Sequence, residues 1–265
     1  MIPTSPNDDD FPWWLLIVAA TGALLFWQVL SDDTYSRVLD TLKKGIWVTT
    51  YVTLISYVSA CAMGLGLALM ALSKSLILRQ LARLYVEIMR GIPIIVLLLY
   101  VAFVVAPALV AFRNWLFEPL GIEAIRGRDF PLIWRAVIAL TLAYASFLAE
   151  VFRAGLQSVD QGQIEAAEAL GLNRWQRFRH IVFPQAFRTI LPPLGNDFVA
   201  MVKDSSLVSV LGVTDITQLG KVTAAGNFRY FETYNVVALI YLTMTIGLSI
   251  GLRRVERRLR ARQIG

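Results

Sequence analysis

Three long stretches without a charged residue constrain this chain more than any other feature. Residues 45–73, 91–112 and 233–252 contain no Asp, Glu, Lys or Arg. A helix needs about 20 apolar residues to cross the hydrocarbon core of a membrane, where only a helix or a closed barrel satisfies the backbone. Three such stretches in a chain of 265 residues, 57% of them hydrophobic, predict an all-α fold, a polytopic membrane helix bundle.

The apolar pattern predicts about six membrane helices, and five if the first segment lies only in the interface. Trp13 and Trp27 lie near the ends of that first segment, as tryptophan does at membrane interfaces. No positive charge precedes it, so we expect an uncleaved helix and not a signal peptide. The expected helices cover residues 11–30, 45–72, 85–109, 131–155, 193–214 and 233–252. A polar loop separates the fourth and fifth expected helices, at 156–190.

The distribution of Lys and Arg predicts the orientation. With the N-terminus inside, the inner segments hold 15 basic residues and the outer segments hold 9. Basic residues favour the cytoplasmic side, and six of them are arginines after residue 252. We therefore expect a multi-pass membrane protein with both termini in the cytoplasm.

Composition argues against several other kinds of site. The net charge of +6 comes mostly from loops between apolar segments, so the basic residues predict orientation and no nucleic-acid partner. Cys61 is the only cysteine and His180 the only histidine. Neither a Cys cluster nor a His-based site for a metal is therefore expected.

The polar loop at 156–190 carries the most informative pattern. Asp160 with Gln163 predicts a capped helix start, and Gly171 can take the left-handed conformation that closes a helix. Asn173 with Gln176 predicts a second short helix, which we expect Pro184 to end. This second helix places apolar side chains on one face: Trp175, Phe178, Ile181 and Val182. A slim, alanine-rich first helix suits insertion into a groove of a cytoplasmic partner, or packing on its own domain.

The loop resembles the EAA loop of ABC-type importer permeases. Glu165-Ala166-Ala167, Gly171, Ile181 and Pro184 have the spacing of that family, and Phe183 replaces the usual Leu. The segments 90–93, 185–188 and 203–210 are similar to the polar amino acid branch. The resemblance covers about residues 41–255. It implies a permease core at 41–255 with its coupling loop at 156–190, an N-terminal extension at 1–40 that carries an extra transmembrane helix, and a basic cytoplasmic tail at 256–265.

The resemblance implies the type I importer fold and a set of partners. Glu165, Ala166, Ala167 and Gly171 become the residues that couple the chain to a dimer of cytoplasmic ATPase subunits. A second permease subunit, identical or merely similar, would pair with this chain, and a periplasmic or extracellular binding protein would deliver an amino acid. The resemblance also implies a bacterial inner membrane, with membrane lipid around the bundle.

ATP chemistry is expected in a partner and not in this chain. A phosphate-binding loop needs Gly, four residues, Gly-Lys and then Ser or Thr. Gly220-Lys221 is followed by Val222 and lacks the earlier glycine. We therefore expect no enzyme activity and no cofactor here, with ATP and Mg bound by the ATPase.

The expected helix at 193–214 is unusually polar. Its residues that can face a pathway are Asn196, Asp197, Lys203, Asp204, Ser205 and Ser206. A charge that faces lipid costs at least about 2.5–3.5 kcal/mol, so these groups should face protein or water. Lys203 and Asp204 point about 100° apart on a helix, so they should not pair with each other. They could contact a zwitterionic substrate, or pair with other helices and form a gate.

Two other functional classes remain as alternatives. A self-contained secondary transporter or channel often has internal repeats and paired broken helices, and the sequence has no convincing repeat. A membrane-embedded enzyme needs catalytic groups, and few candidates lie within the apolar segments. The leading hypothesis is the permease subunit of an ATP-driven amino acid importer.

Overall fold

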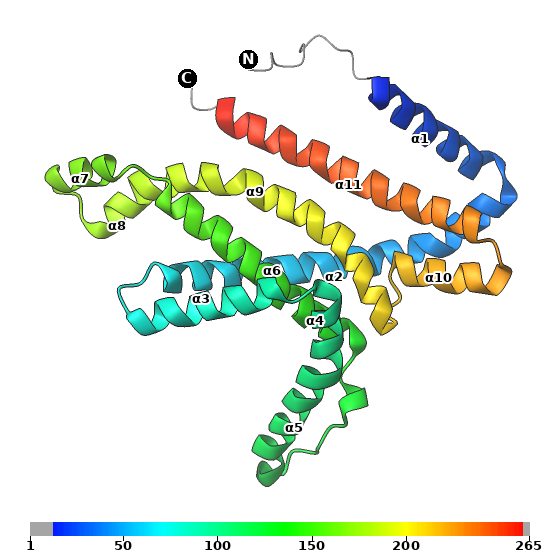
Figure 1. The fold of residues 1–265 in the computed structure, drawn as a ribbon, viewed down its shortest axis with the longest axis horizontal. Coiled ribbons are helices and arrows are strands. Elements are labelled where there is room, and N and C mark those ends of the chain that lie inside the picture. Colours follow the sequence, from blue (N-terminus) through cyan, green and yellow to red (C-terminus); the bar gives the residue numbers. More distant parts are fainter. Residues whose placement is uncertain (1–12, 262–265) are drawn as a thin grey trace, which may run out of the picture.

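The computed structural model describes residues 13–261, and this part of the chain is helical, without a strand. Figure 1 shows long helices side by side, with α4 and α5 pointing away from them. The first half contains α1 (Trp13–Ser31), α2 (Asp33–Ala71), α3 (Leu76–Gly91), α4 (Ile94–Tyr100), a π-helical turn η1 (Val101–Val105), α5 (Ala106–Phe117), η2 (Glu118–Leu120) and η3 (Gly127–Asp129). The second half contains α6 (Leu132–Gln157), α7 (Gln161–Ala169), α8 (Arg174–Arg177), η4 (Phe178–Val182), α9 (Phe183–Asp204), η5 (Ser205–Leu211), α10 (Ile216–Asn227) and α11 (Tyr230–Ala261).

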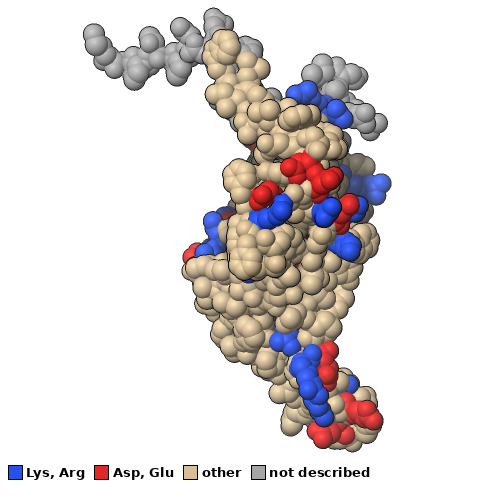
Figure 2. Space-filling model, turned by 90° about the vertical axis from the view of Figure 1, so that its right-hand side faces the viewer, with Lys and Arg blue, Asp and Glu red and all other residues tan. Residues whose placement is uncertain are grey.

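Four helical segments of the described chain are long and apolar enough to cross a membrane. They are Asp33–Ala71, Ile94–Leu120, Leu132–Gln157 and Tyr230–Arg257. In the end-on view of Figure 2, charged side chains gather in two groups with an uncharged surface between them. Large apolar side chains are also exposed outside the helix contacts, for example Trp115 at 71% and Phe103 at 64%. A membrane would cover such surfaces, so the fold confirms the all-α membrane bundle.

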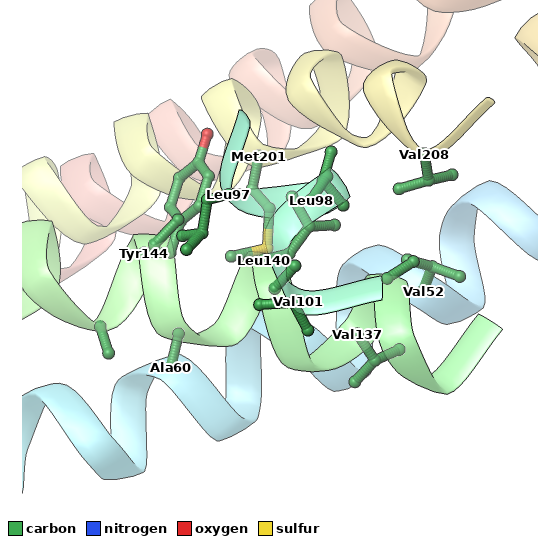
Figure 3. Close-up of a cluster of buried hydrophobic side chains, with 14 of the residues drawn as sticks. Val52, Ala60, Leu97, Leu98, Val101, Val137, Leu140, Tyr144, Met201 and Val208 are labelled. Carbon is green, nitrogen blue, oxygen red and sulfur yellow. The ribbon is translucent and has the colours of Figure 1, made fainter. Parts of the chain in front are cut away.

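The core forms where α2 crosses α6 and where α4 and α9 pack on that pair. Leu140 of α6, Leu98 of α4 and Met201 of α9 are all fully buried. Figure 3 shows these side chains meeting from three different helices. Gly64 of α2 permits the close approach, because a Cβ there would lie 3.0 Å from the Ala145 carbonyl oxygen and the Leu148 Cβ of α6. The expected helix at 131–155 is confirmed as α6.

The expected helix at 85–109 is wrong in its boundaries. The chain breaks between α3 and α4, at Ile92 and Pro93. Ile92 is extended (φ −97°, ψ 127°) because a residue before proline avoids the helical region. Pro93 also has no N–H for a helix bond. The membrane-crossing segment therefore starts at Ile94, and Tyr85 belongs to a separate helix.

The expected helix at 193–214 begins ten residues earlier than predicted. Helix α9 starts at Phe183, contains Pro192 and Pro193, and continues as the 3₁₀ helix η5 to Leu211. Pro184 does not end the preceding helix, contrary to our expectation, because the π-helical turn η4 joins α8 to α9 and places Pro184 in the first turn of α9. A proline is tolerated there because the first-turn N–H groups have no intrahelical partner.

Three expected loops are shorter than the sequence predicts. Helix α2 already starts at Asp33, because Asp32 caps it through a hydrogen bond from the Thr34 N–H (2.7 Å). The boundary expected at residue 40 therefore lies inside α2. The segment 216–233 contains α10, which packs on α2 and α11. Helix α11 continues past 252 to Ala261, and residues 262–265 of the expected tail lie outside the described part, as do residues 1–12.

Candidate coupling loop and transport pathway

The loop after α6 folds as two short helices joined by a glycine turn, as the sequence predicts. Asp160 caps α7 by accepting a hydrogen bond from the Gln163 N–H at 3.3 Å. Gly171 has φ +78°, and its N–H and that of Leu172 donate to carbonyls of Glu168 (2.9 Å) and Ala167 (3.1 Å). These two bonds form the Schellman closure of a helix, which requires a left-handed residue.

The second short helix is capped as expected. The Asn173 side chain accepts from the Gln176 N–H at 3.0 Å, and the Gln176 side chain accepts from the Asn173 N–H at 2.9 Å. An ion pair between Glu168 and Arg177 (2.6 Å) fixes α8 against α7. The aromatic rings of Trp175 and Phe178 stack with centroids 5.9 Å apart.

Gln163 has a different role from the one predicted. Its side-chain oxygen accepts a hydrogen bond from Gln185 of α9 at 2.6 Å, so it joins α7 to α9 and does not complete a capping box. A small apolar cluster packs at the base of the loop, where Val159, Ala186 and Ile190 are buried between α6 and α9. The loop is therefore a rigid protrusion fixed to two long helices.

The four predicted coupling residues divide into exposed and buried groups. Glu165, Ala166 and Gly171 are exposed, whereas Ala167 is buried at 4%. Leu170 beside them is 80% exposed. The protrusion therefore presents the Glu165 carboxylate, small side chains and Leu170 to a partner, beside the exposed Glu168 that pairs with Arg177, and Ala167 packs inward. Figure 1 shows α7 and α8 together at one end of the molecule, beyond the ends of α6 and α9.

The polar residues of α9 and η5 point in several directions. Asp204 is half-buried and accepts a hydrogen bond from the Tyr144 hydroxyl of α6 at 2.7 Å. Lys203 is exposed and forms no ion pair within residues 13–261, so the two neighbours do not pair, as expected. Asp197 is half-buried, within electrostatic range of Tyr57 and Tyr144.

The other three predicted pathway residues are not brought together with Asp204. Asn196 is exposed and lines a hollow of about 260 Å³ between α9 and α11. Ser205 is fully buried and its hydroxyl donates to the Val202 carbonyl at 2.7 Å, so it serves the local backbone. Ser206 is half-buried.

Two tyrosines near these groups were missed by the sequence reasoning. The Tyr144 hydroxyl donates a hydrogen bond to Asp204, and the Tyr57 hydroxyl of α2 donates one to the Leu194 carbonyl of α9 at 2.7 Å. The Tyr57 ring also packs on Phe198, with centroids 4.9 Å apart. A tyrosine inside an apolar stretch is a weak signal, because aromatic residues are common in membrane helices.

Together, the helix bundle and the protruding loop define a membrane transport permease of the type I importer fold. Residues 61–261 match the family described as the binding-protein-dependent transport system inner membrane component. This chain belongs to that family.

Similar proteins of known sequence carry amino acid permease names. The chain is 36% identical to the "Probable amino-acid permease protein YxeN" of Bacillus subtilis, over 79% of this chain and 87% of that one. It is 32% identical to the "Glutamine transport system permease protein GlnP" of Escherichia coli K12, over 83% and 93%.

The chain is also similar in fold to solved structures of ABC transporters. One described as "Crystal structure of an amino acid ABC transporter with histidines" has a TM-score of 0.70 and 34% identity, covering 86% of this chain and 97% of that chain. A chain of the MetNI methionine ABC transporter has a TM-score of 0.63 at 22% identity, and supports the fold alone. The family is one of transport components and not of catalysts.

Proposed function

We propose that this chain is the membrane-spanning permease subunit of an ATP-driven importer for amino acids. The observation that carries the proposal is the rigid α7–α8 protrusion bearing the EAA pattern in a chain of this family. The named relatives transport amino acids or glutamine, which supports that substrate class. They give no support to a self-contained secondary transporter.

The partners follow from this assignment. A dimer of ATPase subunits receives α7, a second permease subunit completes the pathway, and a binding protein delivers the amino acid from the other side. The chain lies in the inner membrane, with the α7–α8 end and both termini in the cytoplasm. ATP and Mg bind to the ATPase subunits. The exposed Glu165, Ala166 and Gly171 contact the ATPase, and the buried Ala167 sets the shape of the protrusion.

A Glu165→Lys variant tests the coupling role. We expect the variant to insert normally, but to lose most of the ATP hydrolysis that a loaded binding protein stimulates, because the sign of the exposed charge is reversed. Glu118→Lys is a matched control, since Glu118 is an exposed carboxylate in η2, far from the protrusion along the chain. Equal stimulated hydrolysis in wild type and Glu165→Lys would remove the coupling assignment.

We also propose that α9 lines the pathway, with Asp204, Asp197 and Lys203 as the charged groups of that wall and the half-buried Ser206 as a polar neighbour. The buried Ser205 supports the backbone of α9, and Asn196 faces the hollow between α9 and α11. A zwitterionic amino acid has a carboxylate and an ammonium, which Lys203 and the two aspartates complement. Asp204→Asn and Lys203→Met should each reduce uptake into reconstituted vesicles by about tenfold or more, which is the usual cost of losing a charge-assisted contact. If both variants transport at the wild-type rate with unchanged substrate preference, α9 has no part in the pathway.

A further inference from the structure

A second charged cavity lies between α2, α3 and α6, outside the residues assigned so far. Its volume is about 330 Å³, at the lower end of the range of small-molecule sites. Small side chains line its base, including Ala68, Ala82 and Ala149. The polar side chains around it come from two helices: Arg83, Glu87 and Arg90 from α3, and Glu150, Arg153 and Gln157 from α6.

The charges of α6 in this cavity pair with each other, whereas Arg83 and Glu87 of α3 have no ion-pair partner among the described side chains. Arg153 pairs with Glu150 at 2.5 Å and donates to Gln157 at 2.8 Å. Arg83 and Glu87 are both exposed. The guanidinium of Arg90 lies over the Phe147 ring of α6, 5.6 Å from its centroid, and interacts electrostatically with Glu150 without a direct ion pair. The cavity thus offers two cations, Arg83 and Arg90, and the carboxylate of Glu87 to a ligand.

This cavity is connected both to the α7–α8 protrusion and to Asp204 of α9. Gln157 is the last residue of α6, directly before the α7–α8 protrusion. Figure 1 shows α3 beside α6 on the side of the molecule that carries α7 and α8. A chain of contacts leads inward from the cavity. Arg90 lies over Phe147, the Phe147 ring lies 5.9 Å from the Tyr144 ring, and the Tyr144 hydroxyl donates to Asp204 at 2.7 Å.

We propose that this cavity is an inner, low-affinity binding site for the transported amino acid on its way to the cytoplasm. Arg83 and Arg90 bind the α-carboxylate, and Glu87 binds the α-ammonium. An open cavity with exposed charges binds weakly, because water competes for each contact, and a release site requires weak binding. The same site lets cytoplasmic amino acid return and inhibit transport. This inference rests on the proposed function, because it assumes an amino acid as substrate.

The test is product inhibition of the complete transporter. Permease and ATPase are reconstituted in vesicles, with the ATPase on the outside and binding protein plus labelled L-glutamine in the lumen. ATP drives label outward, and unlabelled L-glutamine is then titrated into the outer medium. If the complex does not transport L-glutamine, the amino acid that a screen of the twenty common amino acids identifies replaces it in both roles.

We expect outside amino acid to inhibit the wild-type complex. In Glu87→Gln and in Arg90→Gln, the half-inhibitory concentration should rise by about tenfold or more, since each variant loses a charge-assisted contact. The dependence on lumenal substrate at zero outside amino acid should change much less. Lys74→Gln is the matched control, because it removes an exposed cation just before α3 without touching the cavity.

Two results overturn the inner site while transport itself continues: no product inhibition of the wild type, or the same half-inhibitory concentration in wild type, Glu87→Gln and Arg90→Gln. Failure of the proposed function is a different outcome. In that case the complete wild-type system transports none of the twenty amino acids when ATP and the binding protein are present.

Discussion

At the scale of single residues, backbone conformation distinguishes Gly171 and hydrogen bonding distinguishes Tyr144. Gly171 is one of three glycines with positive φ in the described chain, and it closes the protruding helix α7. Tyr144 is 3% exposed, and its hydroxyl donates a hydrogen bond to the carboxylate of Asp204. Each position allows a test that separates local geometry from general folding.

Gly171→Leu should distort the turn after α7, because a left-handed conformation costs a side chain about 1–2 kcal/mol. We expect normal insertion and a reduced rate of ATP hydrolysis in response to loaded binding protein. Gly66→Leu serves as the control, since Gly66 is an exposed helical glycine with open space around it. Full coupling in Gly171→Leu would show that the shape of this turn is unimportant.

Tyr144→Phe should slow transport, because Asp204 loses a hydrogen bond of the kind that contributes about 1.5–3 kcal/mol when one partner is charged. The measurement is uptake into vesicles, with the amount of inserted protein determined in parallel. Tyr100→Phe is the control, as Tyr100 is 53% exposed and does not belong to the buried core. A wild-type rate in Tyr144→Phe would exclude this hydrogen bond from the pathway.

At the scale of elements, close approach between helices explains why the protrusion is rigid. The backbone of α6 at Gly155 lies directly against the side chain of Ile190 in α9. Any Cβ at Gly155 collides with the Ile190 Cγ1 atom. The pair therefore fixes α6 and α9, the two helices between which the α7–α8 protrusion lies in the chain.

Gly155→Val should lower the stability of the purified protein by about 1–3 kcal/mol, the usual cost of overpacking a core. Thermal unfolding in detergent measures this as a lower midpoint temperature. The double variant Gly155→Val with Ile190→Ala should recover part of the loss, because it removes the colliding atoms. Gly247→Val is the control at an exposed glycine of α11. Equal midpoints for Gly155→Val and Gly247→Val would contradict the packing argument.

At the scale of the whole molecule, the basic residues predict which end of the bundle faces the cytoplasm. The expected orientation rests on the 15-to-9 distribution of basic residues, and it places the α7–α8 end inside. To test it, Cys61 is first replaced by Ala, and single cysteines are then introduced as Ser158→Cys and Asn227→Cys. An impermeant thiol reagent applied to intact cells should label only Asn227→Cys. Labelling of Ser158→Cys from outside would reverse the orientation.

The fold class, the two short helices after α6 and the family can be predicted from the sequence alone. Charge-free stretches of 20 residues or more are incompatible with a small soluble domain, and local signals such as Asp160, Gly171 and the Asn173–Gln176 pair act within a few residues of the chain. Such short-range interactions do not depend on distant packing. For the same reason the break at Pro93 could have been read from the sequence, since the residue before a proline avoids the helical region.

The partners of the polar groups and the starting points of the later helices depend on tertiary packing. A proline often ends a helix, but at Pro184 the π-helical turn η4 leads directly into α9, and the contacts of Ala186 and Ile190 with α6 support this longer α9. The partner of Asp204 is 60 residues away in sequence, on a helix whose rotation is set by the α2–α6 core. The cavity at Arg83, Glu87 and Arg90 likewise exists only because α3 folds back beside α6. Periodicity predicts which face of a helix is polar, whereas the neighbour of that face depends on packing across the whole bundle.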